Sequence, residues 1–138
     1  MSRRKARETA VQALFYLDFN QTDPETALTA IIDEREDKIS DNAKEYARIL
    51  VTGTWQQRSA IDGFLSQVSA EWKLDRMAAV DRNIARIAVF EIKFGTEQLP
   101  PNVVINEAIE LAKTFGAEDS SRFINGILDS LVKKQANP

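Results

Sequence analysis

Four basic residues near the start of the chain are the strongest candidates for a chemical role. Arg3, Arg4, Lys5 and Arg7 lie within the first seven residues, which contain no acid, whereas the whole chain has a net charge of −3. We call these four residues the basic head. A basic head on an acidic body predicts a polyanion site that is confined to one end of the molecule. The alternative, that these side chains are merely solvated, stays open at this point.

An aromatic residue extends this candidate site along the same helix. At helical spacing, Arg4, Arg7, Val11 and Phe15 project within a narrow arc beside the expected core stripe. Arginines can bind phosphates and an aromatic ring can stack on a base, so this combination is typical of proteins that bind single-stranded RNA. The alternative is that Phe15 packs against a neighbouring helix.

The chain lacks the residue types on which most enzymes rely. It contains no cysteine and no histidine, which excludes disulfides, thiolate nucleophiles and cysteine-ligated zinc and removes the commonest general base. Glycine-rich phosphate loops and nucleophile elbows are also absent from the sequence. We therefore expect a non-enzymatic protein with no catalytic residue, no metal site and no cofactor.

One carboxylate stands out because of its apolar neighbours. Glu91 falls in the apolar arc of a helix expected at about 75–94, where a buried acid could have a raised pKa. Asp81 lies roughly 80° away around that helix, so the two carboxylates make a poor catalytic pair. We expect Glu91 to be paired with an arginine or with backbone amides.

Apolar residues recur at helical spacing along almost the whole chain, and no alternating run is long enough to predict a strand. The expected helices cover about 3–19, 24–36, 41–69 and 75–94, followed by one from Asn102 to Gly116 and one that opens at residues 118–120. The pattern predicts an all-α fold of six or seven helices.

Capping residues and glycines mark the expected helix ends. Asp23, Ser40 and Asn102 are the expected N-caps, and Gly53 or Gly63 could split the third helix in two. We expect two small helical bundles, about 1–70 and 73–138, joined by a hinge at 70–75. Each bundle is small, so the helix at 75–94 should supply core to both.

Several segments resemble the NusB family of bacterial transcription antitermination factors. The opening SRRKARE at 2–8 with AVQAL at 10–14, and Arg86-Ile87-Ala88 with Glu91, are similar to that family. The stretches VINEAIELAK at 104–113, FGAEDS at 115–120 and FINGILD at 123–129 carry its signature. The resemblance covers essentially the whole chain, is most specific in the last third and is weakest at 41–72.

The resemblance implies a fold and a function. The fold is an all-α NusB-like domain of two small helical bundles. The function is to bind the boxA element of nascent RNA jointly with NusE, a small-subunit ribosomal protein, in the RNA polymerase antitermination complex, where read-through of terminators is promoted. Family members differ in oligomeric state, so the resemblance leaves both a monomer and a homodimer open, and a homodimer through the first helix would hide the arginines.

The resemblance also implies site residues. The expected RNA contacts are Arg3, Arg4, Lys5, Arg7, Phe15, Asp119, Ser120 and Phe123. Asp81 and Arg82 are the candidates for docking NusE. Phe15 stands where the family often has tyrosine, so a hydroxyl contact would be lost while stacking could remain.

Two alternatives to an antitermination factor stay open from the sequence. The first is a protein-interaction module with no direct RNA role, for which the acidic stretch 33–45 would suit a basic partner. The second is a NusB-like domain detached from a ribosomal RNA methyltransferase, although such an enzyme typically needs a catalytic cysteine and a methyl-donor domain. No apolar run approaches the roughly 20 residues of a membrane span, and no apolar signal segment follows the basic head. We therefore expect a cytoplasmic protein.

Overall fold

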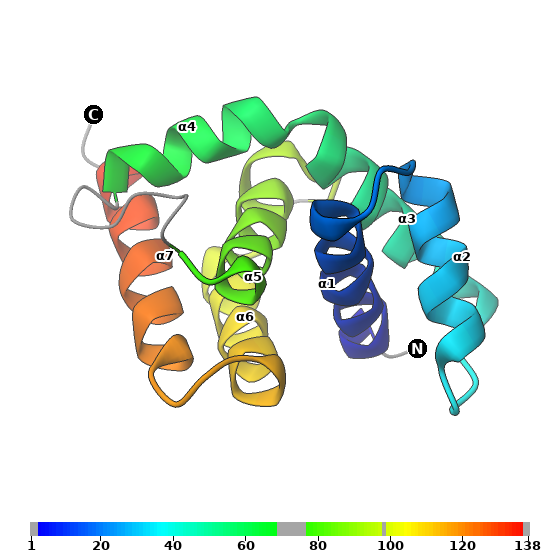
Figure 1. The fold of residues 1–138 in the computed structure, drawn as a ribbon. Helices are drawn as coiled ribbons and strands as arrows, with labels where there is room; N and C mark the ends of the chain where they lie inside the picture. Colours follow the sequence, from blue (N-terminus) through cyan, green and yellow to red (C-terminus); the bar gives the residue numbers. More distant parts are fainter. Residues whose placement is uncertain (1–2, 69–76, 98, 137–138) are drawn as a thin grey trace.

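The computed structural model describes residues 3–68, 77–97 and 99–136, and these residues form an all-α fold (Figure 1). The helices are α1 (Arg3–Phe19), α2 (Pro24–Glu34), α3 (Asp41–Gln56), α4 (Arg58–Val68), α5 (Ala79–Val89), the π-helical turn η2 (Phe90–Phe94), α6 (Pro101–Phe115) and α7 (Ser120–Ala136). The expected hinge at 70–75 lies wholly within 69–76, outside the described residues.

Two groups of three helices lie side by side, with α4 across one end (Figure 1). Helices α1, α2 and α3 pack on one another, as do α5, α6 and α7. Helix α4 was expected in the N-terminal half, but it packs more extensively against α5 and α7 than against α3. The division of the chain near residue 70 stays a prediction.

Helix α5 is the central helix, as its apolar sequence predicts. Every residue from Asn83 to Val89 is buried, and α5 contacts α1, α3, α4, α6 and α7. Apolar side chains from both groups form one continuous core. Burial of this shared surface joins the two groups of helices, because apolar area removed from water is the main stabilising contribution to folding.

Local capping signals account for several helix starts. The Asp23 carboxylate accepts a hydrogen bond from the Thr26 amide at 2.7 Å, and the Ser40 hydroxyl accepts one from the Ala43 amide at 3.1 Å. Both expected caps are confirmed. The expected cap at Asn102 is wrong, because α6 begins at Pro101. Proline is favoured at the first helical position, since its missing N–H has no helical partner there.

The expected long helix at 41–69 is two helices, and the break does not fall at a glycine. The chain changes direction at Gln57, between α3 and α4. Gly53 instead permits a close approach, because a Cβ at that position would overlap Cε1 and Cζ of Phe90 in η2. Gly63 has nothing within 4 Å of an added Cβ. The two glycines therefore have different roles, although both lie inside helices.

The two glycines give a matched test of this packing. We expect Gly53→Ala to lower the free energy of unfolding by about 1–3 kcal/mol, because the new methyl group must displace a buried ring. The control Gly63→Ala should raise it by roughly 0.5–1 kcal/mol, because alanine is the better helix former. Urea denaturation measures both, and equal effects of the two substitutions would contradict the close contact with Phe90.

Candidate nucleic-acid interface

One residue of the basic head, Arg7, lies in the interior and not on the surface. Its Nε donates to Glu91 Oε1 at 2.9 Å and its Nη2 donates to Glu91 Oε2 at 2.8 Å. The Arg7 and Glu91 side chains are only 6% and 3% exposed. The expectation that Glu91 is paired with an arginine is confirmed. The expected role of Arg7 in RNA contact does not fit this position, because its guanidinium is turned inward and already bound to Glu91.

A tyrosine completes the buried ion pair. The Tyr46 hydroxyl donates to Glu91 Oε2 at 2.5 Å. Burial, and then this hydrogen bond to a carboxylate, raise the pKa of Tyr46 above its ordinary range, so the hydroxyl stays protonated and keeps donating. Glu91 therefore receives three hydrogen bonds from two elements, α1 and α3. These three donors join α1 and α3 to one carboxylate of η2.

The other three cations of the head lie at the surface, each beside an acid from elsewhere in the chain. Arg3 Nη2 lies 2.5 Å from Glu97 Oε1, Arg4 Nη2 lies 3.0 Å from Glu107 Oε2, and Lys5 Nζ lies 3.1 Å from Asp37 Oδ2. The Arg3 guanidinium also lies 4.3 Å from the centre of the Tyr46 ring, a cation–π distance.

These acids remain ionised at neutral pH. The hydrogen bonds from Arg3 and Arg4 lower the pKa of Glu97 and of Glu107, respectively. Arg35, and then Lys5, lower the pKa of Asp37 in the same way. No sequence pattern predicts these three acids as partners of the head. They lie 32 to 103 residues from their partners along the chain, and no local pattern connects such distant positions.

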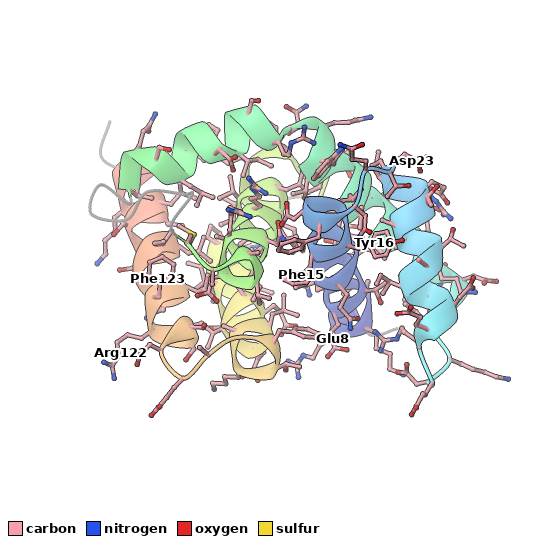
Figure 2. The ribbon with its side chains drawn as sticks, viewed as in Figure 1. Glu8, Phe15, Tyr16, Asp23, Arg122 and Phe123 are labelled. Atoms are coloured by element: carbon pink, nitrogen blue, oxygen red, sulfur yellow. The ribbon has the colours of Figure 1, made fainter. Side chains whose placement is uncertain are left out.

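Phe15 lies further along α1, beside an apolar groove. It is 40% exposed and contacts Phe19, which is 66% exposed, with ring centres 4.8 Å apart. The groove has a volume of about 530 Å³, and its lining includes Val80 at the start of α5 and Phe115 at the end of α6. Figure 2 shows Phe15 on the side of α1 that faces α5. The ring is therefore open to a ligand and also packed at one edge.

The three expected contacts near the start of α7 lie around a second, smaller hollow. Asp119, Ser120 and Phe123 line a cavity of about 210 Å³ together with Asp81. Ser120 itself is buried, and its hydroxyl accepts a hydrogen bond from the Ala117 amide at 2.9 Å, so it holds the turn before α7. The structure thus brings an expected NusE contact, Asp81, next to expected RNA contacts.

The two expected docking residues, Asp81 and Arg82, have different surroundings. Asp81 Oδ1 is buried at the cavity and accepts no hydrogen bond from the described part of the chain. Arg82 Nη2 lies 3.5 Å from Asp18 Oδ2 on α1. Asp81 Oδ1 therefore lacks a hydrogen-bond donor among the described residues, whereas Arg82 helps to join α5 to α1.

The candidate contacts do not form a single cluster. Figure 2 shows Phe15 on α1 and Phe123 on α7, with α5 and α6 between them. The first turn of α5 connects the two places, because Val80 lines the groove and Asp81 lines the cavity. Phe15 lies eleven residues after Arg4 on α1, which is roughly 16 Å along a helix.

The described ranges hold no group of three His, Cys, Asp or Glu residues that could bind a metal ion. Among the helices described, none is long and apolar enough to cross a membrane.

The buried ion pair predicts a large effect of a single substitution. Glu91→Ala should lower the free energy of unfolding by about 3–5 kcal/mol, because it leaves the Arg7 charge buried without its main partner. The double variant Arg7→Met/Glu91→Leu should recover most of that loss, because both charges are then removed. Urea denaturation at pH 7 checks both values. A loss below about 1 kcal/mol for Glu91→Ala, as at an exposed pair, would show that the pair is not buried in solution.

Comparisons with known proteins agree with this fold. The NusB family model matches residues 4–133. The transcription antitermination protein NusB of Symbiobacterium thermophilum is 50% identical over 139 residues, which cover 96% of this chain and 90% of that protein. The NusB protein of Desulforamulus reducens is 47% identical, with 100% and 96% covered.

Solved structures of NusB proteins are also similar to this chain. The structure of NusB from T. maritima superimposes with a TM-score of 0.85 at 40% identity, over 97% of this chain and 92% of that chain. A crystal structure of the antitermination factors NusB and NusE in complex with dsRNA contains a chain that matches with a TM-score of 0.84 at 28% identity, over 96% of each chain. The family model and the curated relatives span nearly the whole chain, and the resemblance found in the sequence is confirmed: this protein belongs to the NusB family.

Proposed function

We propose that this protein is an RNA-binding transcription antitermination factor that binds boxA RNA together with NusE and acts in the RNA polymerase antitermination complex. The observation that carries this proposal is the match over nearly the whole chain to NusB antitermination proteins, one of which was solved with NusE and dsRNA. Family membership favours a binding protein over an enzyme. An antitermination factor acts on nascent transcripts, so we place it in the cytoplasm.

The surface part of the basic head is the proposed site for RNA phosphates. Arg3, Arg4 and Lys5 lie on the first turn of α1, and the Arg4 side chain is about half exposed. Arg7 belongs to the support of this turn, because its guanidinium is bound to Glu91 inside the protein. Guanidinium groups suit phosphates because they can donate two parallel hydrogen bonds.

The groove at Phe15 is the proposed site for RNA bases. The cavity at Phe123 is the proposed site for NusE. Phe15 offers a half-exposed ring for stacking, which is worth about 1–3 kcal/mol per base. The cavity carries two carboxylates, Asp81 and Asp119, and so disfavours phosphates. A basic partner protein could donate hydrogen bonds to Asp81 Oδ1. A homodimer through α1 would cover Phe15 and Phe19 and stays a prediction.

Removal of the surface arginines tests the RNA role of the head. We expect Arg3→Ala/Arg4→Ala to weaken boxA RNA binding by about ten-fold at low salt and to reduce the slope of log K against log salt by roughly 1.4. Fluorescence anisotropy over a NaCl series measures both. The matched control is Arg48→Ala/Arg58→Ala, which removes the same charge from α3 and α4. Unchanged affinity at moderate salt, or an equal loss in the control, would show that the head has no RNA role.

The small number of exposed cations also predicts a need for the partner. Three surface cations can neutralise few phosphates, and the rest of the chain is acidic, so binding by this chain alone should be weak and sensitive to salt. Addition of purified NusE should raise the affinity for boxA RNA more than the affinity for a scrambled RNA of the same length. Equal boxA affinity with and without NusE would contradict joint binding.

A further inference from the structure

All three surface cations of the basic head are already bound to acids of the same chain. The acids are Glu97 after η2, Glu107 on α6 and Asp37 between α2 and α3. These are tertiary contacts between distant parts of the chain, with 94 residues between Arg3 and Glu97 and 103 between Arg4 and Glu107. The fold, and not the local helix, places a carboxylate beside each cation.

The pair between Arg4 and Glu107 uses the groups that would bind a phosphate. Arg4 Nε donates to Glu107 Oε1 at 3.3 Å, and Arg4 Nη2 donates to Glu107 Oε2 at 3.0 Å. This two-point geometry is the one that a guanidinium uses for phosphate oxygens. Arg4 cannot donate the same N–H groups to both acceptors at full strength. A phosphate at this position must therefore displace Glu107.

Arg3 is held from two sides. Its Nη2 donates to Glu97 Oε1, and its guanidinium lies over the Tyr46 ring. The Glu97 side chain is exposed and pairs with no other cation among the described residues, so the ion pair with Arg3 is what keeps its carboxylate here. Asp37 differs, because it also pairs with Arg35 at 2.8 Å and would stay in place without Lys5.

We propose that Glu97 and Glu107 are intramolecular competitors of RNA, which hold Arg3 and Arg4 in the free protein and are displaced by RNA phosphates. This inference rests on the proposed function of the head as a phosphate site. The competition lowers the affinity for every polyanion, since each bound phosphate replaces a carboxylate already present. It also favours ligands with several linked phosphates, which displace both carboxylates in one binding event, over a single phosphate.

The size of the effect follows from the exposure of the pairs. Exposed ion pairs contribute little to stability, so release of one pair should tighten RNA binding by about 1.4-fold to five-fold. The gain should shrink as the NaCl concentration rises, because salt screens the internal pairs of the unaltered protein.

The test compares two variants of equal charge. Glu97→Gln/Glu107→Gln removes both competing carboxylates and keeps the side-chain shapes. The matched control Glu25→Gln/Asp129→Asn also removes two exposed acids from ion pairs, but these lie on α2 and α7, away from the head. Fluorescence anisotropy measures binding of boxA RNA, a scrambled RNA and a heparin fragment at 50 and 200 mM NaCl.

The expected result is a gain of about two-fold to twenty-five-fold for the first variant at 50 mM NaCl, with RNA and heparin alike, and a clearly smaller gain for the control. Equal gains in both variants would overturn the proposal, because only net charge would then matter. No gain in either would overturn it as well. Glu97→Gln alone repeats the test without touching Glu107, which lies 3.6 Å from Arg7, and thermal melting verifies that each variant is folded.

The same data separate this inference from the proposed function. A gain on heparin without any preference of the unaltered protein for boxA over scrambled RNA, even with NusE present, would support the competition and contradict the boxA function. A preference for boxA without the gain would support the function and contradict the competition.

Discussion

The buried ion pair between Arg7 and Glu91 is the interaction on which the rest of the site depends. It joins α1 to η2, and the Tyr46 hydroxyl adds α3 to the same carboxylate. A buried charge is tolerated only with its partners in place, so these three elements have little freedom to slide. Arg3 and Arg4 lie four and three residues before Arg7, and therefore on the same side of the helix one turn away. The ion pair thus sets where the surface cations appear.

The position of the pair also explains why acids surround the head. Glu107 lies close to Arg7 as well as to Arg4, so one carboxylate of α6 connects the interior pair to the surface. Glu97 lies six residues after Glu91, just beyond η2, and reaches Arg3. In the protein without RNA, the head is therefore a charge-balanced surface and not a free patch of four positive charges. Its charge becomes available only when another anion replaces the internal acids.

Sequence patterns predicted the parts of the fold that depend on neighbours along the chain. Helical periodicity placed α1 and α6 closely, and side-chain caps placed the starts of α2 and α3. The break at Gln57 has no such signal. The amide of Gln57 still donates to the Gly53 carbonyl, and its carbonyl accepts from the Ile61 amide, so Gln57 itself keeps both of its helical hydrogen bonds. The contact of Gly53 with Phe90 depends on a residue 37 positions away.

In the candidate site, too, the contacts between residues far apart along the chain could not be predicted from local patterns. Spacing predicts Arg4, Arg7 and Phe15 on one arc of α1 beside the core, but the three side chains have different environments. Arg7 is buried on Glu91, Arg4 is held at the surface by Glu107, and Phe15 lies at the edge of a groove. Burial on a helix face is decided by what packs against it, and spacing along one helix contains no information on α6 or η2.

The two ends of the proposed site, the basic head on α1 and the cavity at the start of α7, differ in charge. The cavity at the start of α7 holds Asp81 and Asp119, and Asp81 Oδ1 accepts no hydrogen bond from the described residues. A buried acceptor without a donor costs about 1–3 kcal/mol, and a phosphate, which has no donor to offer at neutral pH, cannot relieve that cost. A lysine or arginine of a partner protein can. The cavity therefore suits a basic protein and the head suits RNA phosphates. The proposed complex with both NusE and RNA would supply a ligand of the matching charge to each of them.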